Sequence, residues 1–288
     1  MVIVNLKGGL GNQMFQYALG RHLAEKNNVV LKLDTTSLSK AEEIGNIYRP
    51  FDLDAFNIKN ELATPQEVRS LRYPYGIFSK LKNIFERKIL RKTFVEFDAK
   101  VLELKDDTYL DGYWQSPKYF EAIRNTLLAD FTLKNPLSPS GQALQEKILK
   151  STSVALHVRH GDYVTNQRVL NENGICSVEY YKRAIEIILS KVPDPTFFVF
   201  SDDIEWAKAN LTLPTDAVFV SDKTISAPEE LYLMSACQHN IIANSSFSWW
   251  GAWLNQNGDK TVIAPTPWFD TITYDKNLIP DSWIQLPK

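Results

Sequence analysis

The 288-residue chain has few cysteines and almost no net charge, and each shortage excludes a class of protein. Two cysteines, Cys176 and Cys237, are too few for a disulfide framework or for a metal site built from cysteine alone. Their scarcity indicates a reducing compartment. The formal net charge is −2, so the chain lacks the broad basic face that salt-dependent nucleic-acid binding requires. We therefore expect no nucleic-acid partner.

Long apolar runs are also missing. No segment approaches the ~18 consecutive apolar residues of a membrane-spanning helix. The opening residues, MVIVNLKGGLG, have neither the charged start nor the apolar core of a secretion signal. We therefore expect a cytoplasmic protein with at most peripheral contact at the inner face of the membrane. The composition, 44% hydrophobic and 23% charged, is that of an ordinary folded protein, and the length predicts two domains.

The second half of the chain alternates between short apolar runs and segments with helical spacing. The run TFFVF is typical of a strand, and the stripe of apolar residues over 177–190 repeats at spacings of three and four. Such an alternation predicts an α/β fold with a parallel sheet that is covered on both faces. The predicted strands are 154–159, 196–200, 217–220, 240–243 and 261–264, and the predicted helices are 177–190, 202–210, 228–237 and 247–257.

The first half opens with the same pattern, then becomes less regular. The segment NPLSPSG (135–141), with two prolines and a glycine, predicts a linker. We therefore expect domains at 1–140 and 141–288. Two α/β domains leave a cleft between them, and open parallel sheets bind ligands beyond the carboxyl ends of their strands. The predicted elements are strands at 2–6, 29–33 and 108–114, helices at 12–26, 66–72, 79–92 and 117–128, and a loop at 48–56.

The first predicted strand ends in a glycine-rich turn before a helix. Gly9, Gly11, Asn12 and Gln13 lie in this turn, GGLGNQ. Glycines let the backbone approach a ligand closely, and a helix start offers unpaired N–H groups. A tight turn alone explains the pattern equally well.

The strand at 154–159 ends in HVRHGDY. His157 and Arg159 point to the same side of an alternating strand, and a guanidinium can pair with a phosphate through two hydrogen bonds. The alternative is a structural salt bridge between Arg159 and Asp162.

The next strand ends in Ser201, Asp202 and Asp203. Carboxylates at this position can bind a divalent cation, or accept hydrogen bonds from a base or a ribose. They can equally cap the helix that follows.

The strand at 240–243 is followed by Asn244, Ser245, Ser246 and Phe247, a turn that exposes the amides and hydroxyls an anion site needs. A P-loop, GxxxxGK[ST], is absent. These features together indicate a nucleoside diphosphate held without a P-loop. We expect at least two of the tryptophans that follow to pack in the core: Trp249, Trp250 and Trp253.

Four ordered motifs then match a known family. The segments KGGLGNQMFQYA, HVRHGDYV, FVFSDD and ELYLMSACQHNIIANSSFSWWGAW resemble the alpha-1,2-fucosyltransferases of glycosyltransferase family eleven. Weaker similarity in YRPFDLDAF and GYWQSPKYF extends the resemblance over nearly the whole chain. It implies a GT-B-like pair of Rossmann-type domains facing a cleft. It also implies inverting transfer of L-fucose from GDP-beta-L-fucose, without a metal or other cofactor, to the 2-hydroxyl of a terminal galactose in an O-antigen or related surface oligosaccharide.

The resemblance also implies roles for individual residues. Arg159, helped by His157, would bind the donor diphosphate and stabilise the leaving GDP. Asp162 is our first candidate for the base, His157 the second, and a dissociative path without a strong base is the alternative. One departure stands out, because the family commonly has arginine where this chain has His160. The other expected donor ligands are Gly9, Gly11, Asn12, Gln13, Ser201, Asp202, Asp203, Asn244, Ser245, Ser246 and Phe247, and the expected acceptor ligands are Tyr48, Arg49 and Gln115.

Three other functions compete with this hypothesis. A transferase for another linkage or another GDP-sugar would use the same motifs. A non-catalytic sugar- or nucleotide-binding module would use Trp268 and the tryptophan cluster as a carbohydrate platform. A metal-dependent transferase would use Asp202 and Asp203 as ligands.

Overall fold

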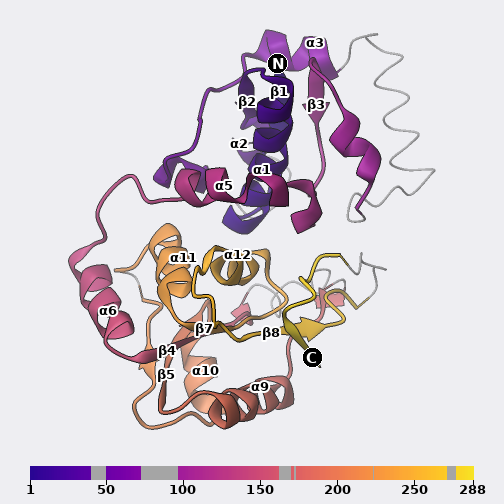
Figure 1. Cartoon of the computed structure of the whole chain (residues 1–288). Helices are drawn as coiled ribbons and strands as arrows, with labels where there is room; N and C mark the ends of the chain where they lie inside the picture. The colour runs from indigo at the N-terminus through magenta and orange to yellow at the C-terminus, as the bar shows by residue number, and fades with distance from the viewer. Residues whose placement is uncertain (40–49, 73–96, 162–169, 172, 223, 271–276) are drawn as a thin grey trace. The chain divides into compact units, whose positions relative to one another are not determined.

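The computed structural model divides the chain into two compact units (Figure 1). One comprises Met1–Thr132 with Asp275–Leu278, and the other Leu133–Tyr274 with Ile279–Lys288. The structure describes residues 1–39, 50–72, 97–161, 170–171, 173–222, 224–270 and 277–288. The candidate site residues Tyr48, Arg49 and Asp162, and the helix predicted at 79–92, lie outside this part of the chain.

The first unit is built on three parallel strands in the order β2-β1-β3. The helix α1 follows β1 and packs on it so closely that a Cβ at Gly20 would lie 2.2 Å from Val4 Cγ2. The predicted strand–helix–strand opening is confirmed. The elements are β1 (Val2–Asn5), α1 (Leu10–Asn27), β2 (Leu31–Asp34), α2 (Thr36–Ser39), η1 (Asp52–Ala55), α3 (Pro65–Arg72), η2 (Ala99–Glu103), β3 (Thr108–Leu110), η3 (Pro117–Tyr119), η4 (Glu121–Ile123) and α5 (Arg124–Asp130).

Two predictions for this unit were wrong. The strand predicted at 108–114 ends at Leu110, and Trp114 has a φ of 54°, which strand backbone does not allow. The helix predicted at 117–128 is broken into η3, η4 and α5, because Phe120 leaves the helical region at φ −145° and ψ 7°. Its ring is fully buried, 5.9 Å from the ring of Phe15.

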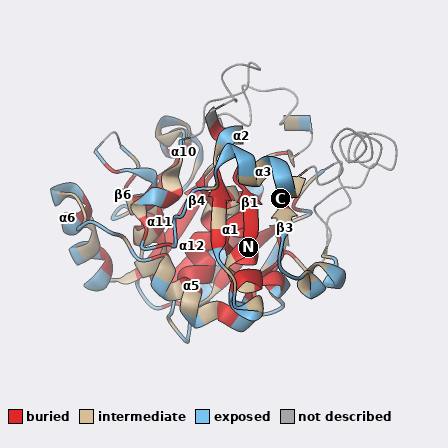
Figure 2. Cartoon of the chain, turned by 90° about the horizontal axis from the view of Figure 1, so that it is seen from above, coloured by how far each residue is buried: buried red, intermediate tan, exposed pale blue. Residues whose placement is uncertain are grey.

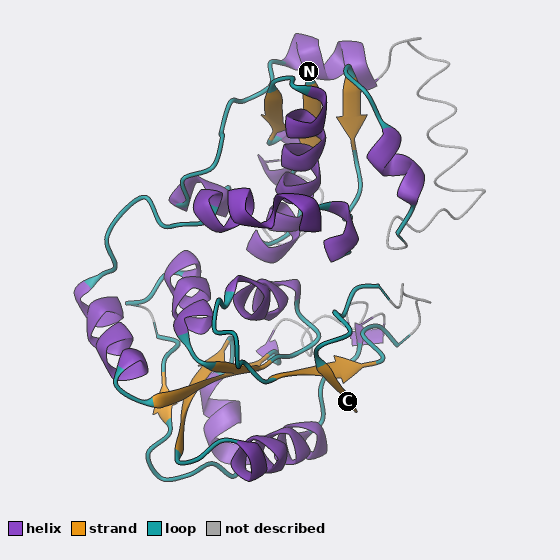
Figure 3. Cartoon of the chain, in the orientation of Figure 1, coloured by secondary structure: helices purple, strands orange, loops and turns teal. Residues whose placement is uncertain are grey.

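The second unit contains a six-stranded sheet in the order β6-β5-β4-β7-β8-β9, in which every neighbouring pair is parallel. Helices α9 and α10 cover one face and α11 and α12 the other (Figures 1 and 3). The predicted α/β class with parallel sheets is therefore confirmed. The elements are α6 (Pro139–Leu149), β4 (Thr152–Val158), α9 (Val178–Lys191), β5 (Pro195–Ser201), α10 (Ile204–Asn210), β6 (Val218–Phe219), α11 (Ala227–Ala236), β7 (His239–Ile241), α12 (Ser246–Leu254), β8 (Val262–Thr266) and β9 (Ile284–Pro287).

Two helix boundaries and one strand differ from the prediction. The segment predicted as a linker, 135–141, ends inside α6, because Ser138 caps the helix through the Gly141 N–H and Pro139 occupies its first turn. Helix α12 stops at Leu254 rather than at Asn257, since the Asn255 amide donates to the Cys237 and Gln238 carbonyls. The edge strand β9 was not predicted.

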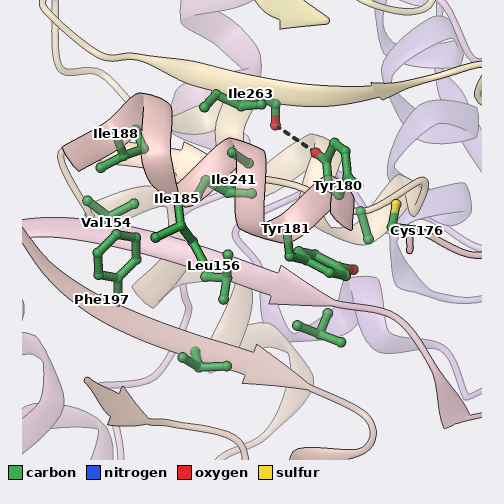
Figure 4. Close-up of a cluster of buried hydrophobic side chains, with 14 of the residues drawn as sticks. Val154, Leu156, Cys176, Tyr180, Tyr181, Ile185, Ile188, Phe197, Ile241 and Ile263 are labelled. Carbon is green, nitrogen blue, oxygen red and sulfur yellow. Dashed lines mark hydrogen bonds between the residues drawn. The ribbon is translucent and has the colours of Figure 1, made fainter. Parts of the chain in front are cut away.

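The core of the second unit lies between α9 and the sheet (Figure 4). Tyr180 and Ile188 on α9 are fully buried against Leu156 of β4. The Tyr180 hydroxyl donates to the carbonyls of Ile242 and Ile263, and so ties α9 to the ends of two neighbouring strands. The apolar stripe predicted over 177–190 is therefore the face of α9 that packs on the sheet.

Helix α12 on the opposite face is buried from Ser248 to Leu254 (Figure 2). Trp249 and Trp250 are completely buried with ring centroids 5.1 Å apart, and Trp253 is 5% exposed. Core packing of the tryptophans is confirmed. Trp268 is also buried, at 2% exposure. None of the four offers the exposed ring face that a carbohydrate platform needs.

The packing of α1 on β1 yields a stability prediction. Gly20→Val places a branched side chain where Val4 Cγ2 and Leu31 Cδ1 leave no room for a single Cβ. We expect a loss of roughly 2–3 kcal/mol in the free energy of unfolding, as for other overpacked cores, measured by denaturant unfolding.

The matched control is Gly258→Ala, because an added Cβ there meets nothing within 4 Å. Its unfolding free energy should stay within about 0.5 kcal/mol of wild type. Equal losses in the two variants would contradict the packing described for α1.

Candidate functional site

The sheet of the second unit reverses its strand order between β4 and β7. Strands β5 and β6 lie on one side of β4, and β7, β8 and β9 follow on the other. This is the order of a doubly wound Rossmann sheet, in which ligands bind at the carboxyl ends of the two strands that flank the reversal. His157 is the penultimate residue of β4, Arg159 directly follows that strand, and Ser245 comes four residues after the end of β7. Two predicted phosphate-binding segments therefore end at the position that the fold favours for a ligand.

His157 is a buried, neutral imidazole near the start of α12. Its side chain is 3% exposed and its ring centroid lies 5.8 Å from that of Phe247. Burial and, to a smaller extent, the positive charge of Arg159 lower the pKa of His157 to about 3, against the opposing effect of Asp202. Its Nδ1 has no hydrogen-bond partner among the described residues. At neutral pH this side chain offers a hydrogen bond without a charge.

Arg159 carries the fixed positive charge at this edge of the sheet. Its Nη1 lies 3.2 Å from Asp202 Oδ2, and both side chains are partly exposed, at 20% and 25%. The alternative partner considered for Arg159, Asp162, lies outside the described residues. An ion pair with Asp202 fixes the guanidinium in place while leaving part of it open to solvent.

The adjacent carboxylates after β5 are both bound to the turn that follows Arg159. Asp202 Oδ1 accepts a hydrogen bond from the His160 N–H at 2.9 Å, and Asp203 Oδ2 lies 2.9 Å from His160 Nδ1. Asp203 also accepts from the Trp206 N–H as the cap of α10, so the capping alternative is confirmed for this residue. Ser201 accepts from the Asp203 N–H and donates its own N–H to Ser221.

In the turn after β7, Asn244 holds the backbone together, whereas Ser245 leaves the start of α12 without a side-chain cap. Asn244 is 2% exposed, and its amide donates to the carbonyls of Asn173, Gly174 and Trp268. Ser245 precedes α12 as the N-cap, but its side chain makes no capping hydrogen bond. The first amides of α12, starting at Ser246, therefore have no side-chain cap from Ser245, and such a helix start favours an anion.

The predicted site residues of the first unit form a second group. Gly9 is the N-cap of α1, which includes Gly11, Asn12 and Gln13 in its first turn and a half. Gln115 Nε2 donates to Asn12 Oδ1 at 2.8 Å, which joins a predicted acceptor ligand to a predicted donor ligand. The buried Gln13 amide donates to the carbonyls of Gly8 and Pro50.

Sequence reasoning missed Glu230, the fourth residue of α11. Burial raises its pKa to about 7, with the negative charges of Asp222 and Asp202 acting in the same direction and a hydrogen bond with Ser221 opposing them. The available signal was an acid in the first turn after Pro228, which we interpreted only as favourable to the helix dipole.

Two features are absent from the described residues. No group of three or more His, Cys, Asp or Glu side chains that could hold a metal ion occurs among them. In the same part of the chain, no helix combines the length and the apolar character needed to cross a membrane.

The buried neutral state of His157 predicts an acid-sensitive stability. Because its folded-state pKa lies below the unfolded value, only the unfolded chain gains this proton as the pH falls below about 6.5. The free energy of unfolding should therefore drop by about 2 kcal/mol between pH 8 and pH 5 on account of this group. His157→Gln should remove that part of the decline, as measured by urea unfolding at each pH. Identical pH dependence in the two proteins would show that the imidazole is not buried neutral.

The fold agrees with a comparison to solved structures. The crystal structure of the fucosyltransferase NodZ from Bradyrhizobium matches with a TM-score of 0.52 at 17% identity, over 87% of this chain and 91% of that chain. At this identity the match establishes a shared fold only.

Sequence similarity is stronger and covers the full length. An alpha-1,2-colitosyltransferase of Escherichia coli is 33% identical over 296 residues, covering 100% of this chain and 99% of that protein. The O-antigen biosynthesis glycosyltransferase WbnK of Escherichia coli is 32% identical over 303 residues, with coverages of 98% and 99%. The model of "Glycosyl transferase family 11" matches residues 1–286. The chain therefore belongs to glycosyl transferase family 11.

Proposed function

We propose that the protein transfers L-fucose from GDP-beta-L-fucose to the 2-hydroxyl of a terminal galactose, with inversion and in an O-antigen or related surface glycan. The observation that supports this most directly is the convergence of Arg159, His157 and the start of α12 at the strand reversal of a family 11 glycosyltransferase. In this proposal residues 141–288 bind the donor, residues 1–140 bind the acceptor, and the two form a GT-B-like pair.

The leaving GDP needs a stabilising charge as its bond to the sugar breaks. Arg159 can supply it, because its guanidinium is held by Asp202 and remains partly exposed. The amides at the start of α12 add donors for the second phosphate, and neutral His157 adds a hydrogen bond. These groups together offer a diphosphate site that needs no metal.

The proton of the acceptor hydroxyl must also leave. A histidine whose pKa is near 3 is a weak base at neutral pH, so His157 fits this role poorly. Asp162 remains the proposed base. Tyr48, Arg49 and Gln115 remain the proposed acceptor ligands, of which Gln115 is 8% exposed and bonded to Asn12.

A second donor deserves an equal test, because the 33% identical relative is named an alpha-1,2-colitosyltransferase. Colitose is fucose without the 3-hydroxyl. A site that hydrogen-bonds this hydroxyl discriminates strongly against the sugar that lacks it, whereas an apolar pocket discriminates weakly.

The proposed function is tested with the two donors and a panel of acceptors. The purified protein is given GDP-fucose or GDP-colitose with oligosaccharides that end in galactose in different linkages. Release of GDP and the linkage of the product are measured. We expect a higher kcat/KM with GDP-fucose and an alpha-1,2 product. A preference for GDP-colitose would replace the proposed donor, and binding without release of GDP would indicate a non-catalytic module.

Removal of the fixed charge should slow the reaction. We expect Arg159→Ala to lower kcat/KM by on the order of 10²–10³-fold, since no metal shares the charge of the leaving group in this proposal. The control is Arg183→Ala on α9, an exposed arginine that bonds to the Glu179 and Pro287 carbonyls. Turnover of Arg159→Ala within threefold of wild type would remove the assignment.

Chelation distinguishes the metal-dependent alternative. Both Asp202 and Asp203 are already engaged by groups of the protein, which leaves them poorly placed as metal ligands. We expect full activity after dialysis against EDTA, assayed without added metal. Loss of activity that Mg²⁺ or Mn²⁺ restores would favour the metal-dependent transferase instead.

A further inference from the structure

His160 is held on two sides by the first residues of the segment that forms α10. Its Nδ1 lies 2.9 Å from Asp203 Oδ2, and its ring stacks on Trp206 with centroids 4.3 Å apart and an interplanar angle of 18°. The side chain is 18% exposed. An imidazole held by a carboxylate and a stacked indole is directed at its own neighbours in the protein, and any effect on the site passes through them.

The neighbours connect His160 to Arg159. Asp202 bridges the two residues, since its Oδ2 lies 3.2 Å from Arg159 Nη1 and its Oδ1 accepts the His160 N–H. The turn also passes close to this carboxylate, because a Cβ at Gly161 would lie 3.1 Å from Asp202 Oδ2. Arg159 is therefore held by a turn that two adjacent carboxylates anchor.

The charge of this group depends on one proton. Arg159, Asp202 and Asp203 together carry −1, and a protonated His160 brings the group to neutrality. When His160 is neutral, the group keeps one uncompensated carboxylate charge near the negative diphosphate of the donor. The two negative charges then repel each other at short range in a partly buried site. An arginine at this position would carry its charge at every pH.

We propose that His160 is a positioning residue for donor binding: its protonated imidazole neutralises Asp203, which keeps Arg159 available to the diphosphate, and affinity for the donor falls when the proton is lost. This inference rests on the proposed function.

Other titratable groups surround this one and must be separated from it. Asp203 is the carboxylate that faces the ring, Asp202 and Arg159 lie along the same turn, and Trp206 covers one face. From α11, Glu230 acts on Asp202, and with a pKa raised to about 7 it also gains negative charge as the pH rises. Its effect has the same sign as the loss of a proton from His160.

The test measures the KM for GDP-fucose from about pH 5.5 to 8.5 at saturating acceptor. Both phosphates of this donor are esterified, so its own charge stays constant over this range. In wild type we expect the KM to rise roughly three- to tenfold with pH, as one charge near a phosphate predicts, while kcat changes much less. His160→Arg should give a low KM and His160→Gln a high KM, each with no more than the small rise with pH that Glu230 adds.

Three further variants make the result specific. Glu230→Gln should keep the rise in KM, and so should His22→Gln, the matched control for another partly buried histidine that lies in the first unit. Asp203→Asn removes the negative charge but can still cap α10, so adding it to His160→Gln should return the KM toward the low-pH value of wild type. Thermal unfolding of each variant checks that it is folded.

Two outcomes would overturn the inference. One is a rise in KM with pH that is as large in His160→Gln as in wild type, and the other is a rise that Glu230→Gln alone abolishes. The proposed function fails separately, if GDP-fucose is not used at any pH or if Arg159→Ala leaves the KM and kcat unchanged. If His160→Gln does not fold, the comparison of His160→Arg with wild type still decides the question, because a KM that rises with pH as much in the arginine variant as in wild type contradicts the proposal.

Discussion

The reversal of strand order between β4 and β7 is the constraint on which the rest of the second unit depends. Two parallel strands that neighbour each other across this point send their following segments in opposite directions, so the space beyond their carboxyl ends stays open. The residues that occupy this edge are Arg159, after β4, and the start of α12, after β7. A guanidinium and a helix start are the two devices that proteins commonly use to bind an anion, and the fold sets them beside each other.

Structure and function share the same carboxylates here. Asp203 caps α10 and holds His160, while Asp202 fixes Arg159 and the backbone of the turn. Neither group is free to be optimised for one task alone. A partly exposed ion pair contributes little stability by itself, so the pair has more value as a means of fixing the direction of the guanidinium. The position of these two acids directly after β5 therefore serves the candidate site as well as the cap of α10.

The sequence allowed the fold class to be predicted, together with most elements and the segments of the site. The stripe over α9 and the strand TFFVF in β5 depend on local spacing, and local spacing is visible in a sequence. The partner of Arg159 could not be found in this way. Asp162 is close in sequence, whereas Asp202 becomes a neighbour only because β4 and β5 pair in register, with Val158 beside Ser201. The burial of Asn244 and the break at Phe120 likewise depend on tertiary contacts.

The role of Asn244 restricts how this protein could be redesigned for another sugar nucleotide. Its carboxamide holds three separate stretches of backbone at once, through the carbonyls of Asn173, Gly174 and Trp268. No shorter or purely accepting side chain can make those bonds. Substitutions aimed at a new donor are therefore better directed at Ser245 and Ser246, since the Ser245 side chain makes no capping hydrogen bond. Asn244 is best left unchanged in any mutant library.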